Sequence, residues 1–479
     1  MSGLLAHLPG AAAFAGRRVT VAGLGVSGVS AARALARAGA HVTAVDGGDG
    51  ERPRARAAEL AGEGVDVRLG DGDTLPPGTE LVVTSPGWRP DSPLFAAASA
   101  AGAEVIGDVE VAWRLRGPAG PPWLAVTGTN GKTTTVRMLA AILTAAGLRT
   151  AAVGNIGASL VDAVLADPPY DVLAVELSSY QLHWAPSVRA HSGAVLNLAP
   201  DHLDWHGSMA AYAAAKGRVY EGNVAACVYN AEDPATEALV READVTEGCR
   251  AIGFTLGPPG LSQLGVVDGV LADRAFLPDR LHRAQELAGV ADVDPPAPHN
   301  IANALAAAAL ARAYGVEPRA VRDGLRAFRP DPHRIEHVAD VGGVAYVDDS
   351  KATNTHAAAA SLAAYPSVVW IAGGLAKGAT FDDLVREAAK TLRGAVLIGA
   401  DRPLIAEALA RHAPGVPVVE VTEAGTGAMA EAVREATGLA APGDTVLLAP
   451  ACASMDMFAN YAERGHSFAA AVRALPAAP

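Results

Sequence analysis

Short apolar runs alternate with alanine-rich segments over most of the chain. Runs of β-branched and other apolar residues, such as 19–22, 81–84 and 445–448, are each followed by a loop, and stretches rich in Ala, Leu and Arg lie between them. Strands that alternate with helices in this way are typical of parallel sheets covered by helices. The fold class predicted for the whole chain is therefore α/β.

Two segments rich in proline and glycine, 117–122 and 328–332, interrupt the alternation, because proline continues neither a helix nor a central strand. Interpreted as linkers, they divide the 479 residues into three domains, 1–119, 120–330 and 331–479. The first and third are predicted to be Rossmann-like, and the second to hold a central parallel sheet. Residues 254–298 are predicted to be a loop-rich insertion with a hairpin turn at Asp268-Gly269.

Composition and charge exclude several classes of function. Acidic residues outnumber basic ones, 51 to 38, and the formal net charge of −13 disfavours nucleic acid and anionic membrane surfaces. No apolar segment reaches the ~20 residues that a bilayer requires, and no secretory signal is recognisable. The three cysteines, Cys227, Cys249 and Cys452, lack a Cys-x-x-Cys spacing. We therefore expect a cytoplasmic protein without membrane insertion and without a nucleic-acid partner.

A glycine-rich turn follows the first predicted strand. Gly23-Leu24-Gly25-Val26-Ser27-Gly28 leads into a predicted helix, and Asp46 ends the next strand. Glycines at this spacing let backbone N–H groups approach a diphosphate, and an acid about 20 residues later suits a ribose hydroxyl. Ser85 and Gly87 follow another strand and would complete the pocket. The pattern indicates a nucleotide diphosphate site, and a tight turn without a ligand is the alternative.

The most specific motif opens the second domain. The apolar run 123–127 precedes Gly128-Thr129-Asn130-Gly131-Lys132-Thr133-Thr134. Lys132 would neutralise the β/γ-phosphates of a nucleoside triphosphate, and the Thr133 hydroxyl would bind Mg²⁺. The motif is shorter than the usual P-loop, because only Thr129 and Asn130 separate its two glycines. It predicts a triphosphate site at the start of a helix, on a central sheet of the P-loop type.

Three further residues are candidates for the same site. Glu176 ends a buried run that begins at residue 171, and a carboxylate at a neighbouring strand end suits Mg²⁺. His202 follows the predicted strand 194–198 and is a candidate metal ligand or general base, two roles that the sequence does not separate. Lys216 ends an alanine-rich helix that offers no carboxylate partner, so a solvated helix lysine is the default interpretation.

Polar residues also gather near the third domain. Asn300 and Asn303 share one face of a predicted helix, where they would contact a purine or cap the helix. Residues 348–354 and 450–456 each follow a predicted strand and hold more acids, hydroxyls and amides than a turn requires. These segments are candidates for a second ligand site.

Together the motifs resemble those of the Mur ligases, a family of bacterial peptidoglycan synthesis, over essentially the whole chain. Residues 128–134 match the family's short P-loop, which folylpolyglutamate synthetases share. Residues 349–354 (Asp-Ser-Lys-Ala-Thr-Asn) and 450–456 (Pro-Ala-Cys-Ala-Ser-Met-Asp) are similar to the branch that adds D-glutamate. The resemblance implies an ATP-dependent ligase with Mg²⁺ as cofactor. Its small-molecule partners would be UDP-N-acetylmuramoyl-L-alanine and D-glutamate, joined through an acyl phosphate.

The resemblance also implies site residues, with the UDP moiety in the first domain, ATP and Mg²⁺ in the second and D-glutamate in the third. The implied UDP-substrate residues are Gly25, Val26, Ser27, Asp46, Ser85, Gly87, Asn155 and Ser178. The implied ATP-binding residues are Gly128, Thr129, Asn130, Gly131, Lys132, Thr133, Thr134, Asn303, Arg334 and Asp349. The implied D-glutamate residues are Lys351, Thr353, Lys377, Ser454 and Tyr461. The implied metal ligands are Thr133, Glu176, His202 and Lys216, the last as a carbamate formed with CO₂, and the implied catalytic residues are Lys132, His202 and Lys216.

The sequence departs from the family's pattern at two places, and two other classes of function are kept as alternatives. Leu375 stands where some members have an acid near Lys377, and Gly47-Gly48 follows Asp46 where other members have polar side chains. An NAD-dependent oxidoreductase would explain the first glycine turn but would leave Lys132 without a role. A non-catalytic P-loop switch would not explain the polar clusters of the third domain.

Overall fold

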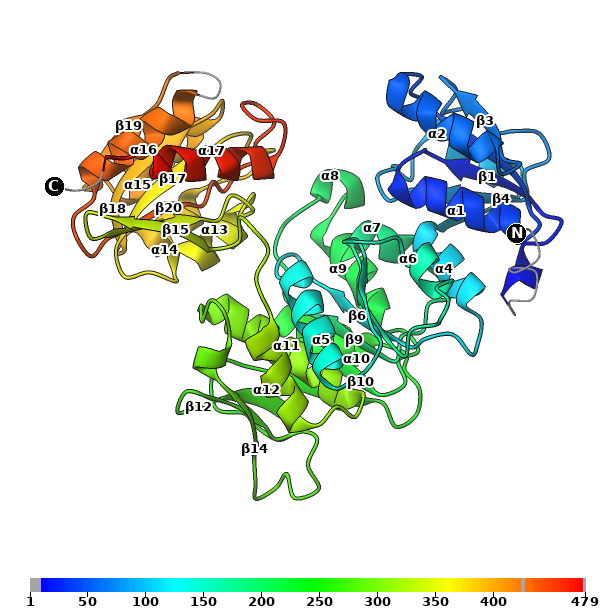
Figure 1. Ribbon diagram of the computed structural model, residues 1–479, viewed down its shortest axis with the longest axis horizontal. Helices are drawn as coiled ribbons and strands as arrows, with labels where there is room; N and C mark the ends of the chain where they lie inside the picture. The colour runs from blue at the N-terminus through cyan, green and yellow to red at the C-terminus, as the bar shows by residue number, and fades with distance from the viewer. Residues whose placement is uncertain (1–9, 424–426, 477–479) are drawn as a thin grey trace. The chain divides into compact units, whose positions relative to one another are not determined.

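The computed structural model describes residues 10–423 and 427–476, which form three sheets and two compact units (Figure 1). The first unit contains the described residues up to Val293 together with Asn300–Phe328. The second contains Asp294–His299 and the described residues from Arg329 onward. The chain therefore crosses from one unit to the other three times, after residues 293, 299 and 328.

The first sheet has five parallel strands in the order β3-β2-β1-β4-β5. They are β1 (Arg18–Ala22), β2 (His41–Asp46), β3 (Asp66–Leu69), β4 (Leu81–Thr84) and β5 (Glu104–Gly107). The helices of this part are α1 (Val26–Arg37), α2 (Glu51–Ala61), α3 (Pro93–Ala100) and α4 (Asp108–Arg116). The strand order reverses between β1 and β4, and the crevice beyond the carboxyl ends of such neighbours is where ligands bind in doubly wound sheets.

The second sheet has nine strands in the order β14-β13-β12-β11-β10-β9-β6-β8-β7. Its parallel strands include β6 (Trp123–Thr127), β7 (Ala152–Gly154), β8 (Leu173–Glu176), β9 (Ser192–Val195), β10 (Ala226–Asn230) and β11 (Arg250–Phe254). The helices of this part are α5 (Lys132–Ala145), α6 (Leu160–Val164), α7 (Ser179–His183), α8 (Leu203–His206), α9 (Met209–Gly217), α10 (Pro234–Glu242), α11 (Pro298–Ala313) and α12 (Pro318–Ala327). The strand predicted over 194–198 begins earlier and ends at Val195, so the next three residues form a loop.

The prediction of a loop-rich insertion over 254–298 is wrong in part. Three strands lie there, β12 (Gln263–Val267), β13 (Val270–Asp273) and β14 (Gln285–Gly289), and they extend the sheet, with β13 antiparallel to both neighbours. The predicted hairpin turn is present between β12 and β13, where Asp268 has φ +48° and Gly269 has φ +77°. Positive φ at both central residues is the requirement of a type I′ turn. The strands are short and are stabilised by pairing with the existing sheet edge, which local sequence does not reveal.

The core of the first unit continues across the 117–122 segment. One hydrophobic cluster contains Val21 and Val83 of the first sheet together with Trp123 and Leu173 of the second. On the other face of the second sheet, α11 is buried almost all round, and eight of its 16 residues are alanine or leucine with no exposed surface. Small alanine side chains let this helix approach its neighbours closely, so its high alanine content serves packing.

The second unit holds a six-stranded sheet in the order β15-β16-β20-β17-β18-β19. Its strands are β15 (Glu336–Val341), β16 (Val344–Asp348), β17 (Val368–Gly373), β18 (Leu392–Ile398), β19 (Val418–Glu420) and β20 (Thr445–Leu448). Its helices are α13 (Thr355–Leu362), α14 (Asp382–Ala388), α15 (Arg402–His412), α16 (Gly427–Leu439) and α17 (Tyr461–Arg473). Among the described strands of this unit, only β15 pairs antiparallel, so β16, β17 and β20 end at the same edge.

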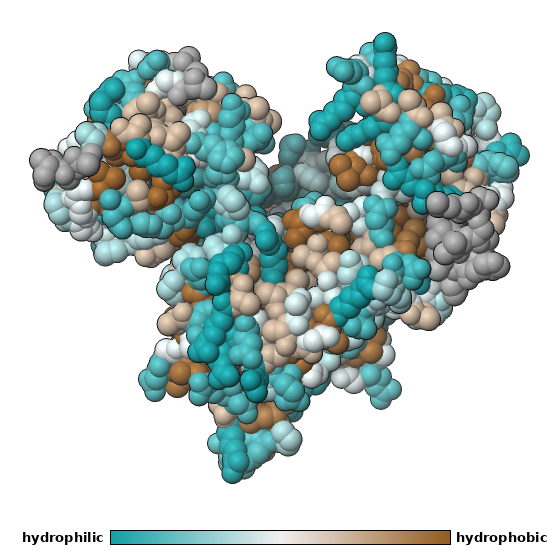
Figure 2. Space-filling model, viewed as in Figure 1, coloured by the Kyte–Doolittle hydropathy of each residue, from teal (hydrophilic) through white to brown (hydrophobic). Residues whose placement is uncertain are grey.

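The α/β fold class is confirmed by these three sheets and their flanking helices. Hydrophilic residues are interspersed with smaller hydrophobic groups on the face that Figure 2 shows. None of the helices formed by the described residues is long and apolar enough to cross a membrane.

Candidate active site

The P-loop turn lies between β6 and α5. α5 begins at Lys132, and Gly131 precedes it in the left-handed region with φ +83°. A Cβ atom at Gly131 would lie 2.3 Å from Asn303 Oδ1 of α11, so both the backbone conformation and the close approach require glycine there. The geometry brings Asn303, which the family resemblance implies as an ATP-binding residue, to the loop.

The side chain of Lys132 bends back over the P-loop. Its ammonium donates to the carbonyls of Gly128 and Thr129, each at 2.9 Å. Asn197 secures the loop from the side, because its Oδ1 accepts from the Asn130 N–H at 2.9 Å and its backbone carbonyl accepts from the Thr129 N–H at 3.1 Å. The motif alone did not point to Asn197, which follows β9.

Lys216 is buried, with 2% of its surface exposed, so a solvated helix lysine is not what the fold contains. Its ammonium donates to the Gly128 carbonyl at 2.8 Å and lies 4.6 Å from the centre of the Tyr212 ring. Burial holds the pKa of Lys216 well below its usual range, and Lys132 lowers that pKa further, against the opposing effects of Asp201 and Glu176. Tyr212 is four residues earlier on the same helix face, a spacing that could have indicated the contact.

Glu176, the last residue of β8, is buried and only partly satisfied. Asn155 Nδ2 donates to Glu176 Oε1 at 2.9 Å, and the Asn155 N–H donates to the Glu176 carbonyl at 2.9 Å. Glu176 Oε2 has no hydrogen-bond partner among the described residues. An orphaned carboxylate oxygen beside a P-loop is the donor type that Mg²⁺ prefers, so this residue fits the implied metal site.

His202 precedes α8 with φ +54°, a conformation that is uncommon for a residue other than glycine. Its side chain is 45% exposed and lies 3.5 Å from Asp201 Oδ2. Partial burial lowers the pKa of His202, Asp201 opposes that shift, and Lys216 and Lys132 reinforce it. The ring of Tyr180 lies 4.9 Å from the imidazole and restricts its orientation.

A crevice of about 760 Å³ lies at the switch point of the first sheet. Gly23, Gly25, Ser85, Gly87 and Trp88 line it together with residues of the following loop. The predicted glycine turn and the loop after β4 therefore do meet.

Several of the implied UDP-substrate side chains take part in contacts within the protein. The Asp46 carboxylate accepts from the N–H groups of Leu24 and Gly48, at 2.7 and 2.8 Å. Burial raises the pKa of the Asp108 carboxyl group, and the nearby Ser27 hydroxyl opposes that rise. Ser178 caps α7. Asp108 belongs to no motif, so sequence reasoning missed it.

In the second unit, the loops that follow β16, β17 and β20 are bonded to one another. The Ala451 N–H donates to the Ala352 carbonyl at 2.9 Å. Leu375 and Ala453 exchange two backbone hydrogen bonds of 2.9 and 3.0 Å. The loops that carry the implied D-glutamate residues Lys351, Lys377 and Ser454 therefore lie side by side.

Side chains of this second cluster are also in contact. Lys351 Nζ lies 3.9 Å from the centre of the Tyr461 ring, and Ser454 is buried. Arg464 was not among the predicted site residues, yet it is 1% exposed and donates to Ser350 Oγ, to the Ser350 carbonyl and to the Cys452 carbonyl at 2.9–3.1 Å. Burial lowers the pKa of Arg464 to about 10. This guanidinium ties the loop after β16 to the loop after β20.

The remaining implied D-glutamate residues belong to the same loops. Thr353 follows β16, and its N–H donates to the Lys351 carbonyl at 2.8 Å. Lys377 follows β17 with φ +50°.

The two implied nucleotide residues of this unit differ in burial. Asp349 is buried and accepts a hydrogen bond from Ser361 Oγ. Burial raises its pKa to about 6, while the Ser361 bond and the Arg334 guanidinium oppose that rise. The Arg334 side chain, in contrast, is partly exposed, and its Nε lies 3.8 Å from Asp331 Oδ2.

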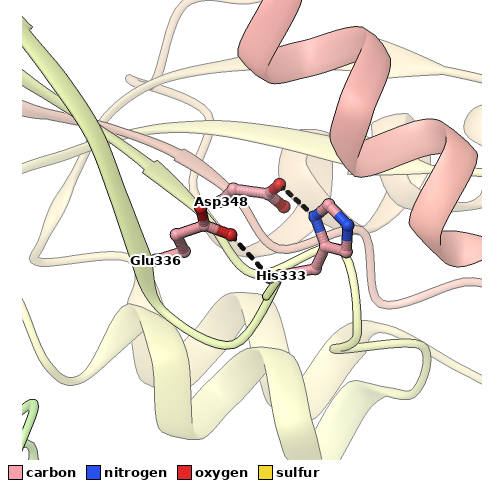
Figure 3. A group of neighbouring side chains, drawn as sticks. All are labelled: His333, Glu336 and Asp348. Carbon is pink, nitrogen blue, oxygen red and sulfur yellow. Dashed lines mark hydrogen bonds and ion pairs between the residues drawn. The ribbon is translucent and has the colours of Figure 1, made fainter. Parts of the chain in front are cut away.

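His333, Glu336 and Asp348 form a compact group in which one ligand-type atom from each lies within 4.8 Å of the others. Figure 3 shows the Asp348 carboxylate directed at the His333 ring and the Glu336 carboxylate directed at the His333 backbone. Asp348 Oδ2 lies 2.7 Å from His333 Nδ1, and Glu336 Oε2 lies 2.8 Å from the His333 backbone nitrogen. Because the two carboxylates point to different groups, the arrangement is a hydrogen-bonded cluster and not three donors around one centre.

Three family comparisons cover most of the chain. The Mur ligase MurD-like N-terminal domain matches residues 17–107, the Mur ligase middle domain matches 126–311, and the Mur ligase glutamate ligase domain matches 333–452. The chain is 75% identical over 462 residues to UDP-N-acetylmuramoylalanine–D-glutamate ligase of Streptomyces avermitilis, covering 96% of this chain and 99% of the relative. The same-named protein of Thermobifida fusca is 63% identical over 96% of this chain and 99% of its own length.

Solved structures of more distant proteins share the fold. The MurF ligase of Thermotoga maritima in complex with ADP superimposes with a TM-score of 0.55 at 16% identity, covering 99% of both chains. UDP-N-acetylmuramate-alanine ligase MurC of the same organism gives 0.54 at 18%, covering 95% of this chain and 99% of the other. The resemblance drawn from the motifs is thus confirmed, and the chain belongs to the Mur ligase family.

Proposed function

We propose that the chain is an ATP-dependent amide ligase that joins D-glutamate to UDP-N-acetylmuramoyl-L-alanine. The observation that carries the proposal is near full-length identity of 75% to a protein named for that substrate pair. The geometry supports the same chemistry. Lys132 of the P-loop and the buried Lys216 both donate to the Gly128 carbonyl, and Glu176 has one carboxylate oxygen without a hydrogen-bond partner among the described residues.

The first chemical step would form an acyl phosphate. The substrate's terminal carboxylate attacks the γ-phosphate of ATP, and ADP leaves. Because two anions approach each other, the barrier is largely electrostatic, and Lys132 would neutralise the phosphates from the start of α5. Bound Mg²⁺ would supply further charge neutralisation, held by Thr133, Glu176 and His202.

Lys216 would join these ligands as a carbamate. The ammonium first loses one proton. The neutral amine then attacks CO₂, a C–N bond forms as one C=O π bond opens to a carboxylate oxygen, and a second proton is released, so an anion replaces the ammonium. The lowered pKa of Lys216 favours the neutral amine that this reaction requires. The hydrogen bond from Lys216 Nζ to the Gly128 carbonyl holds this amine beside the P-loop.

The second step would consume the acyl phosphate. The amine of D-glutamate attacks the acyl carbon, and inorganic phosphate leaves through a tetrahedral intermediate. Lys351, Thr353, Lys377 and Ser454 lie on the three bonded loops, and Tyr461 begins α17. These side chains would hold the two carboxylates of the amino acid. The incoming ammonium must first lose a proton, and His202 is a candidate base as well as a metal ligand.

The decisive experiment is phosphate release with UDP-N-acetylmuramoyl-L-alanine, ATP and Mg²⁺ against a panel of D- and L-amino acids. We expect turnover with D-glutamate only, and none when either substrate is omitted. Comparable turnover with L-glutamate or glycine would move the chain to another branch of the family. ATP hydrolysis without an amino acid would favour a P-loop switch.

A further inference from the structure

The backbone around Arg334 is unusual. His333 has φ +64° and Ile335 has φ +49°, so a left-handed residue stands on each side of Arg334. Residues other than glycine adopt this conformation rarely, and β-branched isoleucine more rarely still. Such backbone persists only where surrounding contacts determine it.

His333 provides those contacts. Its Nδ1 lies 2.7 Å from Asp348 Oδ2, and both side chains are buried, at 5% and 0% exposure (Figure 3). Its N–H donates to Glu336 Oε2 at 2.8 Å, and its carbonyl accepts from the Lys351 N–H at 3.2 Å. The residue before Arg334 is therefore fixed by its side chain and by both of its backbone groups.

The pair is also enclosed from the helix side. Asp348 Oδ1 accepts from the Ser350 N–H at 2.9 Å, so both carboxylate oxygens are used. A Cβ atom at Gly465 of α17 would lie 2.2 Å from His333 Nδ1 and 2.6 Å from Asp348 Oδ2. Only glycine lets the helix lie this close to the hydrogen bond.

We propose that the buried His333–Asp348 hydrogen bond is a positioning device that holds Arg334 in the orientation needed to bind the nucleotide. His333 and Asp348 are positioning residues, because they act through the loop and need not touch the ligand. The inference rests on the proposed function and on the family resemblance, which implies Arg334 as an ATP-binding residue.

The test compares variants that keep the hydrogen bond with variants that remove it. Asparagine tolerates the left-handed conformation, and its Nδ2 stands near the place of His Nδ1, so His333→Asn should keep the KM for ATP within about threefold. His333→Ala removes the donor and should raise that KM about tenfold or more, since a hydrogen bond to a charged group is lost. Asp348→Asn and Asp348→Ala form a second pair with the same expectation, because the amide can bond the other imidazole tautomer.

Two readouts separate positioning from general damage to the fold. The KM values for D-glutamate and the UDP-substrate should stay within about twofold, whereas misfolding would shift kcat and all three constants together. The matched control is His466→Ala, because this exposed imidazole lies 4.7 Å from the His333 ring and makes no bond to it. If His333→Ala does not fold, the Asp348 pair decides the question.

A double-mutant cycle tests whether the His333–Asp348 hydrogen bond acts through Arg334. If the pair acts through Arg334, Arg334→Ala should raise the KM for ATP, and adding His333→Ala should raise it no further. Additive effects, or equal KM values for His333→Asn and His333→Ala, would overturn the inference. No effect of Arg334→Ala would instead refute the proposed nucleotide role of that residue.

Discussion

The ionisation of Asp349 should weaken the second unit at neutral pH. This carboxyl group is 8% exposed, and burial raises its pKa from the ordinary value of 3.8 to about 6. At about 1.36 kcal/mol per pH unit, that rise corresponds to about 3 kcal/mol. Because the folded state holds the proton more tightly, the contribution of Asp349 to stability is highest below about pH 4 and is lost as the pH rises through about 6.

Replacing the group by a neutral isostere should remove the penalty. Asp349→Asn keeps the shape and an acceptor for Ser361, so we expect it to exceed the wild type in stability by about 1.5 kcal/mol at pH 5 and about 3 kcal/mol at pH 8. Activity should fall, because the family resemblance implies that this carboxylate contacts the nucleotide. Residues that bind a ligand often lower the stability of the folded protein, and this trade-off is common at functional sites.

The measurement must follow the second unit by itself. Trp370 on β17 is its only tryptophan and is fully buried, so ¹⁹F NMR of protein labelled with 5-fluorotryptophan can follow urea unfolding there. Asp383→Asn is the control, because its side chain is 87% exposed and hydrated in both states. A variant less stable than the wild type at pH 8, or a difference equal at pH 5 and pH 8, would refute the reasoning.

Three other outcomes can be checked with purified protein. Asn155→Ala should lower the apparent Mg²⁺ affinity roughly 10–100-fold, because Asn155 orients the Glu176 carboxylate; an unchanged Mg²⁺ titration would contradict this role. Lys216→Ala should be inactive and partly rescued by small carboxylates, and wild-type protein in ¹³C-bicarbonate should give a carbamate NMR signal that the variant lacks. Lys351→Ala should raise the KM for D-glutamate by roughly 10²-fold and leave the KM for ATP unchanged, and an equal rise in both constants would show that Lys351 does not act at the amino-acid site.

The sequence by itself determined the features that depend on neighbouring residues. Alternating apolar runs predicted an α/β fold, and glycine spacing predicted the P-loop turn with α5 beginning at Lys132. These elements form from short-range forces, namely burial of a local apolar run and the backbone freedom of glycine. The hairpin turn at Asp268-Gly269 was likewise visible because its signal spans two residues.

Only the tertiary structure decided which polar groups are buried together. The helix that contains Lys216 looks solvated in sequence, yet Tyr212 and the Gly128 carbonyl enclose the ammonium. Arg464 donates to Ser350, 114 residues earlier in the chain, and the His333 ring bonds Asp348, 15 residues later. Desolvation, hydrogen-bond geometry and close approach depend on what packs from elsewhere in the chain, and a local pattern carries no record of that partner.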